Sequence, residues 1–315
     1  MNEYQANKIL IIKHGSLGDV INATSIITAV REKFNNSEID ILTSTPYSSF
    51  FMKMNSSFKV HIDNRKGFLK SVRLLLNLKK KKYDLIIDLQ NSNRTKYYAL
   101  FLKTLSKVKI NGTHQYADFK YNYNKDDPPS VINGLVNQVK LIKIDAVSRP
   151  NLDFLNTDRN ESISFLEKDF FIINPGCSNK NNYKQWSPQN YSKICNHLIS
   201  KNILPVLIGT TSDKESIEII KKNVPSCIDL LNKSPLETIF LLAKNALGAI
   251  SNDTGPAHLI ASTQCRLHLI LSTRSDVKTV IPQSDNVTFN QSDDINNIEP
   301  DDVKFFIDKI LDDRY

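Results

Sequence analysis

The sequence predicts an α/β protein made of two doubly wound domains, each a parallel sheet covered by helices. Short apolar runs alternate with segments of helical periodicity, and this alternation weakens near residue 145 and restarts near residue 170. Continuous apolar strands separated by helices are typical of a parallel sheet that is buried on both faces. The length of 315 residues also exceeds what one core usually supports. We therefore expect domains at residues 1–155 and 156–315, joined by a linker within residues 145–168.

The individual elements follow from the same periodicity. In the first half, we expect strands at residues 9–13, 39–43 and 85–89, and helices at residues 20–34, 69–78 and 131–144. In the second half, we expect strands at residues 170–173, 204–208, 247–251 and 267–271, and helices at residues 187–200, 213–223, 235–244, 255–262 and 300–313. The last helix is amphipathic, and it could pack back on the first domain.

Composition narrows the class of protein. Apolar residues make up 40% of the chain and charged residues 23%, which is ordinary for a globular protein. The cysteines form no C-x-x-C pair, which argues against a zinc knuckle or a disulfide framework and fits a reducing compartment; they are Cys177, Cys195, Cys227 and Cys265. No apolar run is long enough for a signal peptide core or a membrane span. We expect a cytoplasmic protein.

The net charge of +8 is unevenly distributed. Residues 1–157 hold 24 basic and 13 acidic residues, whereas residues 158–315 hold 17 and 20. This asymmetry suggests that the first half meets nucleic acid, an acidic membrane surface or a phosphorylated acceptor. The four lysines at residues 79–82 are a candidate membrane contact. The alternatives are a solvated helix end there, and a lysine-rich composition that reflects nucleotide bias in the genome.

The end of the first strand carries the first candidate site. Residues 13–20 read KHGSLGDV, so two glycines and an acid stand where a parallel strand passes into a helix. Ligands of open α/β sheets bind at this edge. The G-x-x-G spacing differs from the dinucleotide fingerprint, and a carboxylate here would repel a pyrophosphate. Asp19 suits a proton acceptor, because a helix N-terminus favours a carboxylate. The alternative is that Asp19 only caps the helix.

Two similar strand ends lie in the second half. The strand at residues 170–173 runs into the turn NPGCS, followed by a loop with Lys184 and Trp186. Backbone N–H groups and lysines in such a loop suit a diphosphate, although a solvated loop is the commoner case. The strand at residues 247–251 runs into NDTGP, where Asp253 and Thr254 could orient ribose or phosphate oxygens. His258 lies one turn into the next helix, as a ligand contact or as a packed residue.

Three blocks, residues 8–31, 174–188 and 252–261, resemble in order and spacing the heptosyltransferase family, glycosyltransferase family 9. That family reads like SLGDV in the first block, NPG followed by K and WP in the second, and DTG with a following H in the third. The resemblance implies a GT-B architecture, in which two Rossmann-like domains face each other across a cleft. The first domain would hold the acceptor and the second the nucleotide sugar.

The resemblance also implies roles for individual residues. The family's catalytic base falls on Asp19. The donor-binding positions are Lys184 for the diphosphate, Asp253, Thr254, Gly255 and His258 for the nucleotide sugar, Gly176 in the NPG turn, and Asp213 and Glu215 as candidates for the nucleoside. The acceptor-binding positions are Ser16, Gly18 and Asn22, the last standing where members often have His.

The implied reaction is an inverting transfer of heptose, or a related sugar, from a nucleotide-diphosphate sugar such as ADP-heptose to a lipopolysaccharide core or similar glycan. No cofactor is implied. The sequence has no Asp-x-Asp motif, the usual carboxylate pair for a divalent ion, and cationic groups could take the place of a metal. The protein would contact the inner face of the cytoplasmic membrane. Two alternatives are a nucleotide-sugar epimerase of the same architecture and a non-catalytic nucleic-acid-binding protein, although aromatic residues do not interleave regularly with the basic ones.

Overall fold

The computed structural model describes residues 5–104, 106–156, 168–177 and 182–313. The chain divides into two compact units, Met1–Phe154 and Leu155–Tyr315. Each unit is built on one six-stranded sheet in which every pairing is parallel. The expected α/β class with two doubly wound parallel sheets is confirmed.

The sheet of the first unit has the strand order β3-β2-β1-β4-β5-β6. Its strands are β1 Lys8–Ile12, β2 Glu38–Thr43, β3 Lys59–Ile62, β4 Leu85–Asp88, β5 Lys109–Gly112 and β6 Phe119–Lys120. The central pairing places Ile9 beside Ile39 on one side and Leu85 on the other. Strand order therefore reverses between β1 and β4, which makes the carboxyl ends of these two strands a topological switch point.

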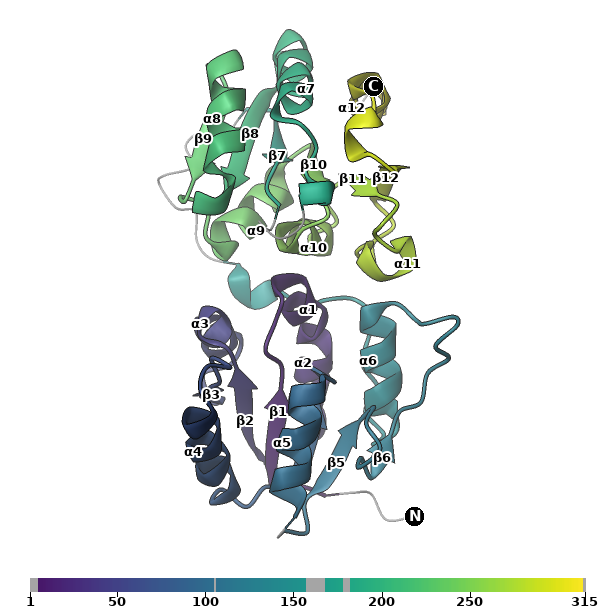
Figure 1. Cartoon of the computed structure of the whole chain (residues 1–315). Coiled ribbons are helices and arrows are strands. Elements are labelled where there is room, and N and C mark those ends of the chain that lie inside the picture. Colours follow the sequence, from purple (N-terminus) through teal and green to yellow (C-terminus); the bar gives the residue numbers. More distant parts are fainter. Residues whose placement is uncertain (1–4, 105, 157–167, 178–181, 314–315) are drawn as a thin grey trace. The chain divides into compact units, whose positions relative to one another are not determined.

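Helices cover both faces of this sheet (Figure 1). They are α1 Leu17–Asn22, α2 Thr24–Lys33, α3 Thr45–Met54, α4 Phe68–Lys79, α5 Asn93–Lys103 and α6 Val131–Lys140. The single helix expected at residues 20–34 is in fact two helices that meet at Ala23. The Thr24 hydroxyl donates to the Ile21 carbonyl at 2.8 Å, a side-chain bond that competes with regular helical bonding and marks the break.

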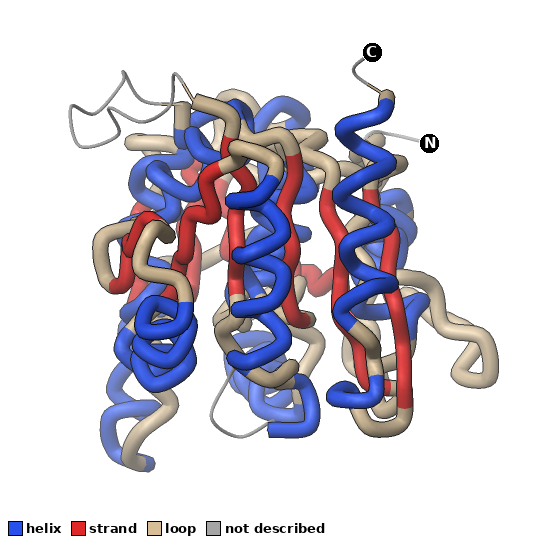
Figure 2. The backbone as a smooth tube through the Cα atoms, turned by 90° about the horizontal axis from the view of Figure 1, so that it is seen from above, coloured by secondary structure: helices blue, strands red, loops and turns tan. Residues whose placement is uncertain are grey.

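The second unit repeats the topology, with the order β12-β11-β10-β7-β8-β9. Its strands are β7 Phe170–Asn174, β8 Leu204–Gly209, β9 Ile228–Leu231, β10 Gly248–Asn252, β11 Leu267–Ser272 and β12 Val287–Ser292. Its helices are α7 Pro188–Ser200, α8 Lys214–Asn223, α9 Leu236–Asn245, α10 Gly255–Ser262, α11 Val277–Val280 and α12 Pro300–Asp312. In Figure 2, blue helices lie on both sides of the red strands. The switch point of this sheet lies between β7 and β10.

The closing helix α12 belongs to the core of the second unit. Val303, Ile307 and Ile310 are buried there in one cluster with Trp186 of the loop before α7. The indole Nε1 donates to the Ile298 carbonyl at 3.1 Å, which fixes the ring. Within the described residues, no helix has both the length and the apolar character needed to span a bilayer.

Candidate functional site

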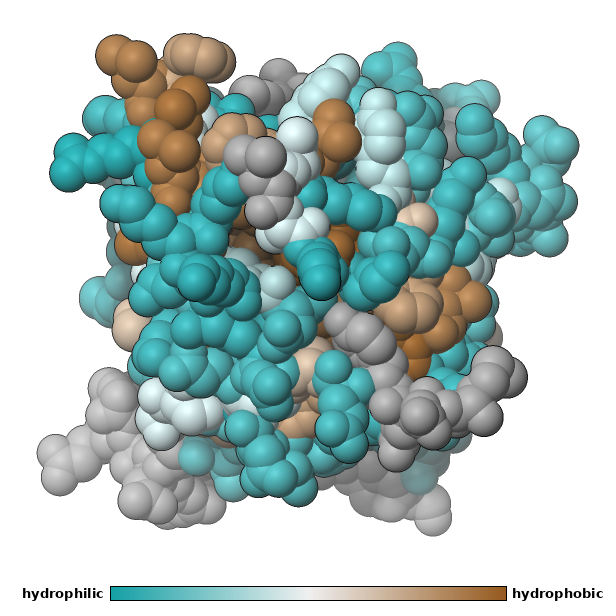
Figure 3. Space-filling model, turned by 90° about the horizontal axis from the view of Figure 1, so that it is seen from below, coloured by the Kyte–Doolittle hydropathy of each residue, from teal (hydrophilic) through white to brown (hydrophobic). Residues whose placement is uncertain are grey.

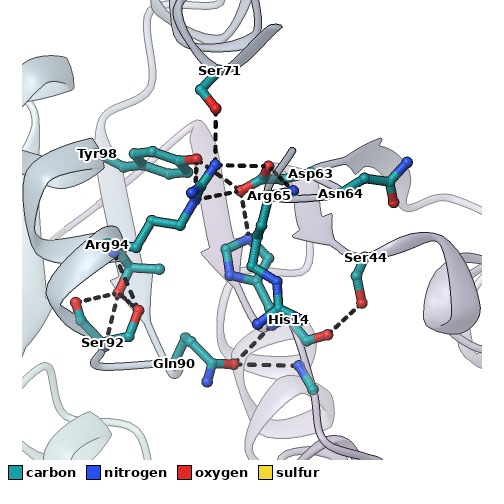
Figure 4. Close-up of polar contacts among 12 residues, drawn as sticks. His14, Ser44, Asp63, Asn64, Arg65, Ser71, Gln90, Ser92, Arg94 and Tyr98 are labelled. Atoms are coloured by element: carbon teal, nitrogen blue, oxygen red, sulfur yellow. Dashed lines mark hydrogen bonds and ion pairs between the residues drawn. The ribbon is translucent and has the colours of Figure 1, made fainter. Parts of the chain in front are cut away.

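The turn after β1 is fixed by the loops that follow its neighbouring strands. Gln90, after β4, accepts hydrogen bonds from the N–H groups of His14 at 2.9 Å and Gly15 at 3.3 Å. The Ser44 hydroxyl, after β2, donates to the His14 carbonyl at 2.6 Å (Figure 4). Gly15 has a φ of +124°, and a Cβ there would lie 2.2 Å from Cε2 of Tyr47. Only glycine fits this position of the turn.

A buried charge network reaches this turn from β3 and α5. His14 Nε2 lies 3.4 Å from the Asp63 carboxylate, which accepts from the Tyr98 hydroxyl at 2.8 Å. Arg94 contacts Asp63 at 3.3 Å and donates to the Ser71 hydroxyl at 2.8 Å (Figure 4). Burial lowers the pKa of His14 to about 4. The histidine is therefore neutral near pH 7, and Arg94 supplies the charge that partners Asp63.

Asp19 both caps α1 and lines a cavity. Its Oδ2 accepts from the N–H and the hydroxyl of Ser16, both at 3.0 Å, so the helix-capping role is present. The same side chain lines a cavity of about 290 Å³ at the carboxyl edge of the sheet. The walls of this cavity come from the ends of β1, β4 and β5, from the segment after β6 and from α6. They include Lys13, Gln90, Asn91, Thr113, Tyr121, Tyr123, Ser130 and Gln138.

Lys13 is a functional candidate that sequence reasoning missed. Its side chain is 3% exposed, and its Nζ donates to the Leu89 carbonyl at 3.0 Å. Burial lowers the pKa of Lys13, while the charges of Asp19 and Asp88 oppose that shift. Asp88 is fully buried, and burial raises its pKa to about 6. The signal in the sequence was a lysine that ends an apolar strand directly before a glycine turn.

The other acceptor candidates do not line this cavity. Ser16 is exposed and caps α1 through its main chain and hydroxyl. Gly18 and Asn22 are buried within α1. Of the four first-unit residues that we singled out, only Asp19 therefore contributes to the wall.

In the second unit, two buried asparagines hold the loops at the switch point. Asn252, at the end of β10, donates from Nδ2 to the carbonyls of Pro175 at 3.0 Å and Gly176 at 3.2 Å. Asn174, at the end of β7, donates to the Thr254 hydroxyl at 2.8 Å. These bonds tie the NPG turn to the start of α10, because each asparagine reaches across to the other strand's loop.

Lys184 and Asp253 form an ion pair at this edge. The Lys184 Nζ lies 2.5 Å from Asp253 Oδ2, and the side chains are 18% and 10% exposed. Ser275 donates to the same carboxylate oxygen at 3.2 Å. Both Lys184 and Arg274 lie over the ring of Tyr183, at 5.9 and 5.3 Å from its centroid. Arg274 is a second cation near the pair, which sequence reasoning did not single out.

The start of α10 completes this group. Thr254 is its N-cap residue, and Gly255 and a proline form its first turn. The free N–H groups of such a helix end favour anions. His258 lies one turn into the helix and is half-buried. Cations and a helix N-terminus at one sheet edge can together bind a diphosphate.

The two candidate nucleoside acids differ in environment. Asp213 is 8% exposed and accepts from the N–H groups of Thr210 at 2.8 Å and Cys177 at 3.3 Å. A Cβ at Gly176 would lie 2.8 Å from the Asp213 carboxyl carbon. Asp213 therefore stabilises the NPG turn by packing against Gly176 and accepting from Cys177, whereas Glu215 is exposed on α8. Among the described residues, no group of three or more His, Cys, Asp or Glu side chains could hold a metal ion.

The two doubly wound units, each with polar residues gathered at its switch point, place the chain in the GT-B fold class. The Escherichia coli ADP-heptose lipopolysaccharide heptosyltransferase II has this fold, with a TM-score of 0.75 at 18% identity over 98% of this chain and 99% of that one. The E. coli heptosyltransferase WaaC with ADP-2-deoxy-2-fluoro heptose gives a TM-score of 0.74 at 16% identity over 96% and 99%.

The chain belongs to glycosyltransferase family 9, the heptosyltransferases, because the family model matches residues 71–303. The family resemblance inferred from the three sequence blocks is thus confirmed, and with it an enzyme that transfers a glycosyl group. A relative of known role is the lipopolysaccharide core heptosyltransferase OpsX of Haemophilus influenzae. It is 23% identical over 273 residues, which are 81% of this chain and 76% of the relative. The first block, with Asp19, lies outside the residues that the family model matches.

Proposed function

We propose that this chain transfers a heptose from ADP-heptose to a lipopolysaccharide core acceptor, with Asp19 as the base. The observation that carries the proposal is the Asp19 carboxylate in the wall of a cavity at the first switch point. Family membership supports the reaction class. The heptosyltransferase WaaC, whose solved structure contains an ADP-heptose analogue, supports the choice of donor. The domain at residues 1–155 holds the acceptor, and the domain at residues 156–315 holds the donor.

In this mechanism Asp19 removes a proton from an acceptor hydroxyl as that oxygen attacks the anomeric carbon. The bond from this carbon to the diphosphate breaks on the opposite face, so the configuration inverts and ADP leaves. Negative charge grows on the diphosphate in the transition state, where preorganised cations and helix dipoles act most strongly. Lys184 and the N-terminus of α10 provide them. The buried Lys13 ammonium balances the Asp19 and Asp88 carboxylates beside the acceptor.

The ion pair of Lys184 and Asp253 has a direct role in this scheme. An incoming diphosphate competes with the Asp253 carboxylate for the Lys184 ammonium. Arg274 and Lys184, which both lie over the Tyr183 ring, add positive charge near the same place. Asp253 then becomes free to accept hydrogen bonds from hydroxyls of the donor, and the Thr254 hydroxyl, which accepts from Asn174, can donate to a donor oxygen. Gly255 and His258, in the first turns of α10, follow Asp253 and Thr254 in the chain.

The two alternative functions are less well supported. A nucleotide-sugar epimerase shares the architecture but needs no acceptor, and the family of this chain consists of transferases. A nucleic-acid-binding protein would use the basic first half, yet the buried Lys13 and Asp19 in a cavity suit a small polar substrate better than a phosphate backbone. We place the enzyme in the cytoplasm, in contact with the inner face of the membrane that carries its acceptor.

Ligand-induced stabilisation tests the donor. The melting temperature of the purified protein is measured across nucleoside diphosphates and nucleotide sugars, since a ligand at 100 times its Kd stabilises by about 2.7 kcal/mol. We expect a selective upward shift with ADP and ADP-heptose. A selective shift with UDP or GDP instead would keep a transferase but reject ADP-heptose as donor. No shift with any of these compounds would contradict the proposal.

A further inference from the structure

We propose that the start of α4 is a docking surface for an anionic lipid bilayer. The proposal rests on the proposed function, because a lipopolysaccharide acceptor is anchored in a membrane. We call this surface the α4 patch. It comprises four exposed apolar or aromatic residues and four exposed basic residues: Phe68, Leu69, Leu76, Tyr97, Arg65, Lys66, Lys70 and Arg73.

The apolar part of the α4 patch is unusually open. Phe68 and Leu69 are each 81% exposed, Tyr97 is 63% exposed and Leu76 is 48% exposed. Single exposed apolar residues are normal on soluble proteins, but neighbouring large ones mark an interaction surface. Figure 3 shows hydrophobic side chains protruding at the upper left, on the side where Figure 1 draws α4. These side chains are therefore candidates to enter an apolar phase.

A groove between α4 and α5 continues this surface. It encloses about 640 Å³ and is lined mainly by apolar and aromatic side chains: Phe68, Val72, Leu75, Tyr97, Tyr98 and Phe101. Arg94 and Ser71 stand at its polar end. Arg94 is already paired with Asp63, so the exposed basic residues of the α4 patch beside this groove are the ones that would meet a negatively charged headgroup.

The charges of the α4 patch indicate that its partner is an anionic lipid surface. Residues 64–76 contain four basic and no acidic residues, and the nearest carboxylate, Asp63, is already bonded to Arg94. Basic residues interspersed with apolar ones suit a surface of anionic lipid headgroups, where each Lys or Arg contributes about 1 kcal/mol. In a dimer formed face to face through this surface, the four basic residues of one copy would meet the four basic residues of the other. Self-association through this face is therefore disfavoured.

The place of the α4 patch in the fold agrees with a lipid-anchored acceptor. A helix that connects parallel strands starts at their carboxyl edge, so Phe68 lies at the same edge of the sheet as Asp19. The contacts of Asp63 with His14 and Arg94 link the segment before α4 to the turn before Asp19. The lysines at residues 79–82, at the other end of α4, lie at the opposite edge. The start of α4 is thus the better membrane contact of the two.

Vesicle co-sedimentation tests the α4 patch with the full chain. Vesicles of phosphatidylcholine are compared with vesicles that also contain phosphatidylglycerol, and we expect binding only to the second. The double variant Phe68→Ser/Leu69→Ser should bind at least about tenfold more weakly, since each buried apolar side chain contributes that much or more. Lys70→Gln and Arg73→Gln should each weaken binding about fivefold. Phe305→Ser, at an aromatic residue of α12 that is 73% exposed, is the matched control.

Activity and oligomeric state complete the test. With a water-soluble fragment of the acceptor, turnover by the double variant should equal that of the wild type, whereas turnover of vesicle-embedded acceptor should fall. Equal vesicle binding by wild type and double variant would overturn the proposal, as would a change in oligomeric state in place of a change in lipid binding. If ADP does not stabilise the wild type, the proposed function is contradicted. This outcome is distinct from equal vesicle binding, which contradicts only the α4 patch.

Discussion

Replacing Lys184 by Ala should weaken donor binding more than the loss of one contact would, because it also releases Asp253. The Lys184 ammonium and the Asp253 carboxylate are 2.5 Å apart, and both side chains are mostly buried. Removing the ammonium leaves a carboxylate at the place where the diphosphate binds. The single variant therefore loses an attraction and acquires a repulsion.

The two effects have comparable sizes. A hydrogen bond between charged groups contributes about 1.5–3 kcal/mol. An uncompensated carboxylate about 6 Å from a phosphate repels it by about 3 kcal/mol at an effective dielectric constant of 20. We expect Lys184→Ala to weaken ADP binding by roughly 10³-fold or more. The double variant Lys184→Ala/Asp253→Asn, which lacks the repulsion, should recover about tenfold or more of that loss.

Isothermal titration with ADP at constant ionic strength measures these affinities. Lys222→Ala, at an exposed lysine near the end of α8, is the control and should bind ADP as the wild type does. The reasoning is refuted if Lys184→Ala binds ADP with wild-type affinity. It is also refuted if the double variant binds more weakly than the single one, since the hydrogen bonds that Asp253 accepts from donor hydroxyls would then outweigh its repulsion of the diphosphate.

Three further outcomes follow from single residues. Gly15→Ala should lower the free energy of unfolding by about 1–3 kcal/mol, measured in denaturant, because the new Cβ meets the Tyr47 ring. Adding Tyr47→Ala should restore part of this loss. Full stability of Gly15→Ala would contradict the steric argument. Burial lowers the pKa of His268 to about 4 in the folded protein. The unfolded state therefore binds a proton more tightly, and the free energy of unfolding falls as the pH drops from 6.5 towards 4. At pH 5 this loss is about 2 kcal/mol. In unfolding series at pH 7 and pH 5, His268→Gln should lack this part of the loss. Asp213→Ala should cost about 1–2 kcal/mol of stability and Glu215→Ala less than about 0.5, and equal costs would rule out a supporting role for Asp213.

The sequence predicted seven inner strands, β1, β2, β4, β7, β8, β10 and β11, but not β5 or the four edge strands. Strands β1, β4, β7 and β10 are buried and appear as continuous apolar runs. Strand β3 reads KVHI and β12 reads VTFNQS, and both are largely exposed or half-buried. Such edge strands depend on pairing with β2 and β11, which a pattern of apolar residues does not reveal.

The candidate site was predictable where one motif carries both the turn and the chemistry. Asp19, Lys184 and Asp253 each lie beside a glycine or proline turn at a strand end. Lys13 was missed because its role depends on burial beside Asp88, a residue 75 positions away in the sequence. The start of α4 was missed for the opposite reason, because its apolar residues are exposed and not buried. In the sequence, Phe68 and Leu69 resemble ordinary core residues of a helix.

The most direct test of the account is heptosyl transfer by the wild type and by Asp19→Asn, with ADP-heptose and a truncated lipopolysaccharide core. Asparagine keeps an oxygen that can accept from the Ser16 N–H and so preserves the helix cap, but it cannot take a proton. We predict that the wild type transfers heptose, and that Asp19→Asn retains its folding stability and ADP affinity while kcat falls by about 10²–10⁴. Near wild-type turnover by Asp19→Asn would contradict the assignment of the base, and a wild type that transfers no heptose would contradict the proposed function.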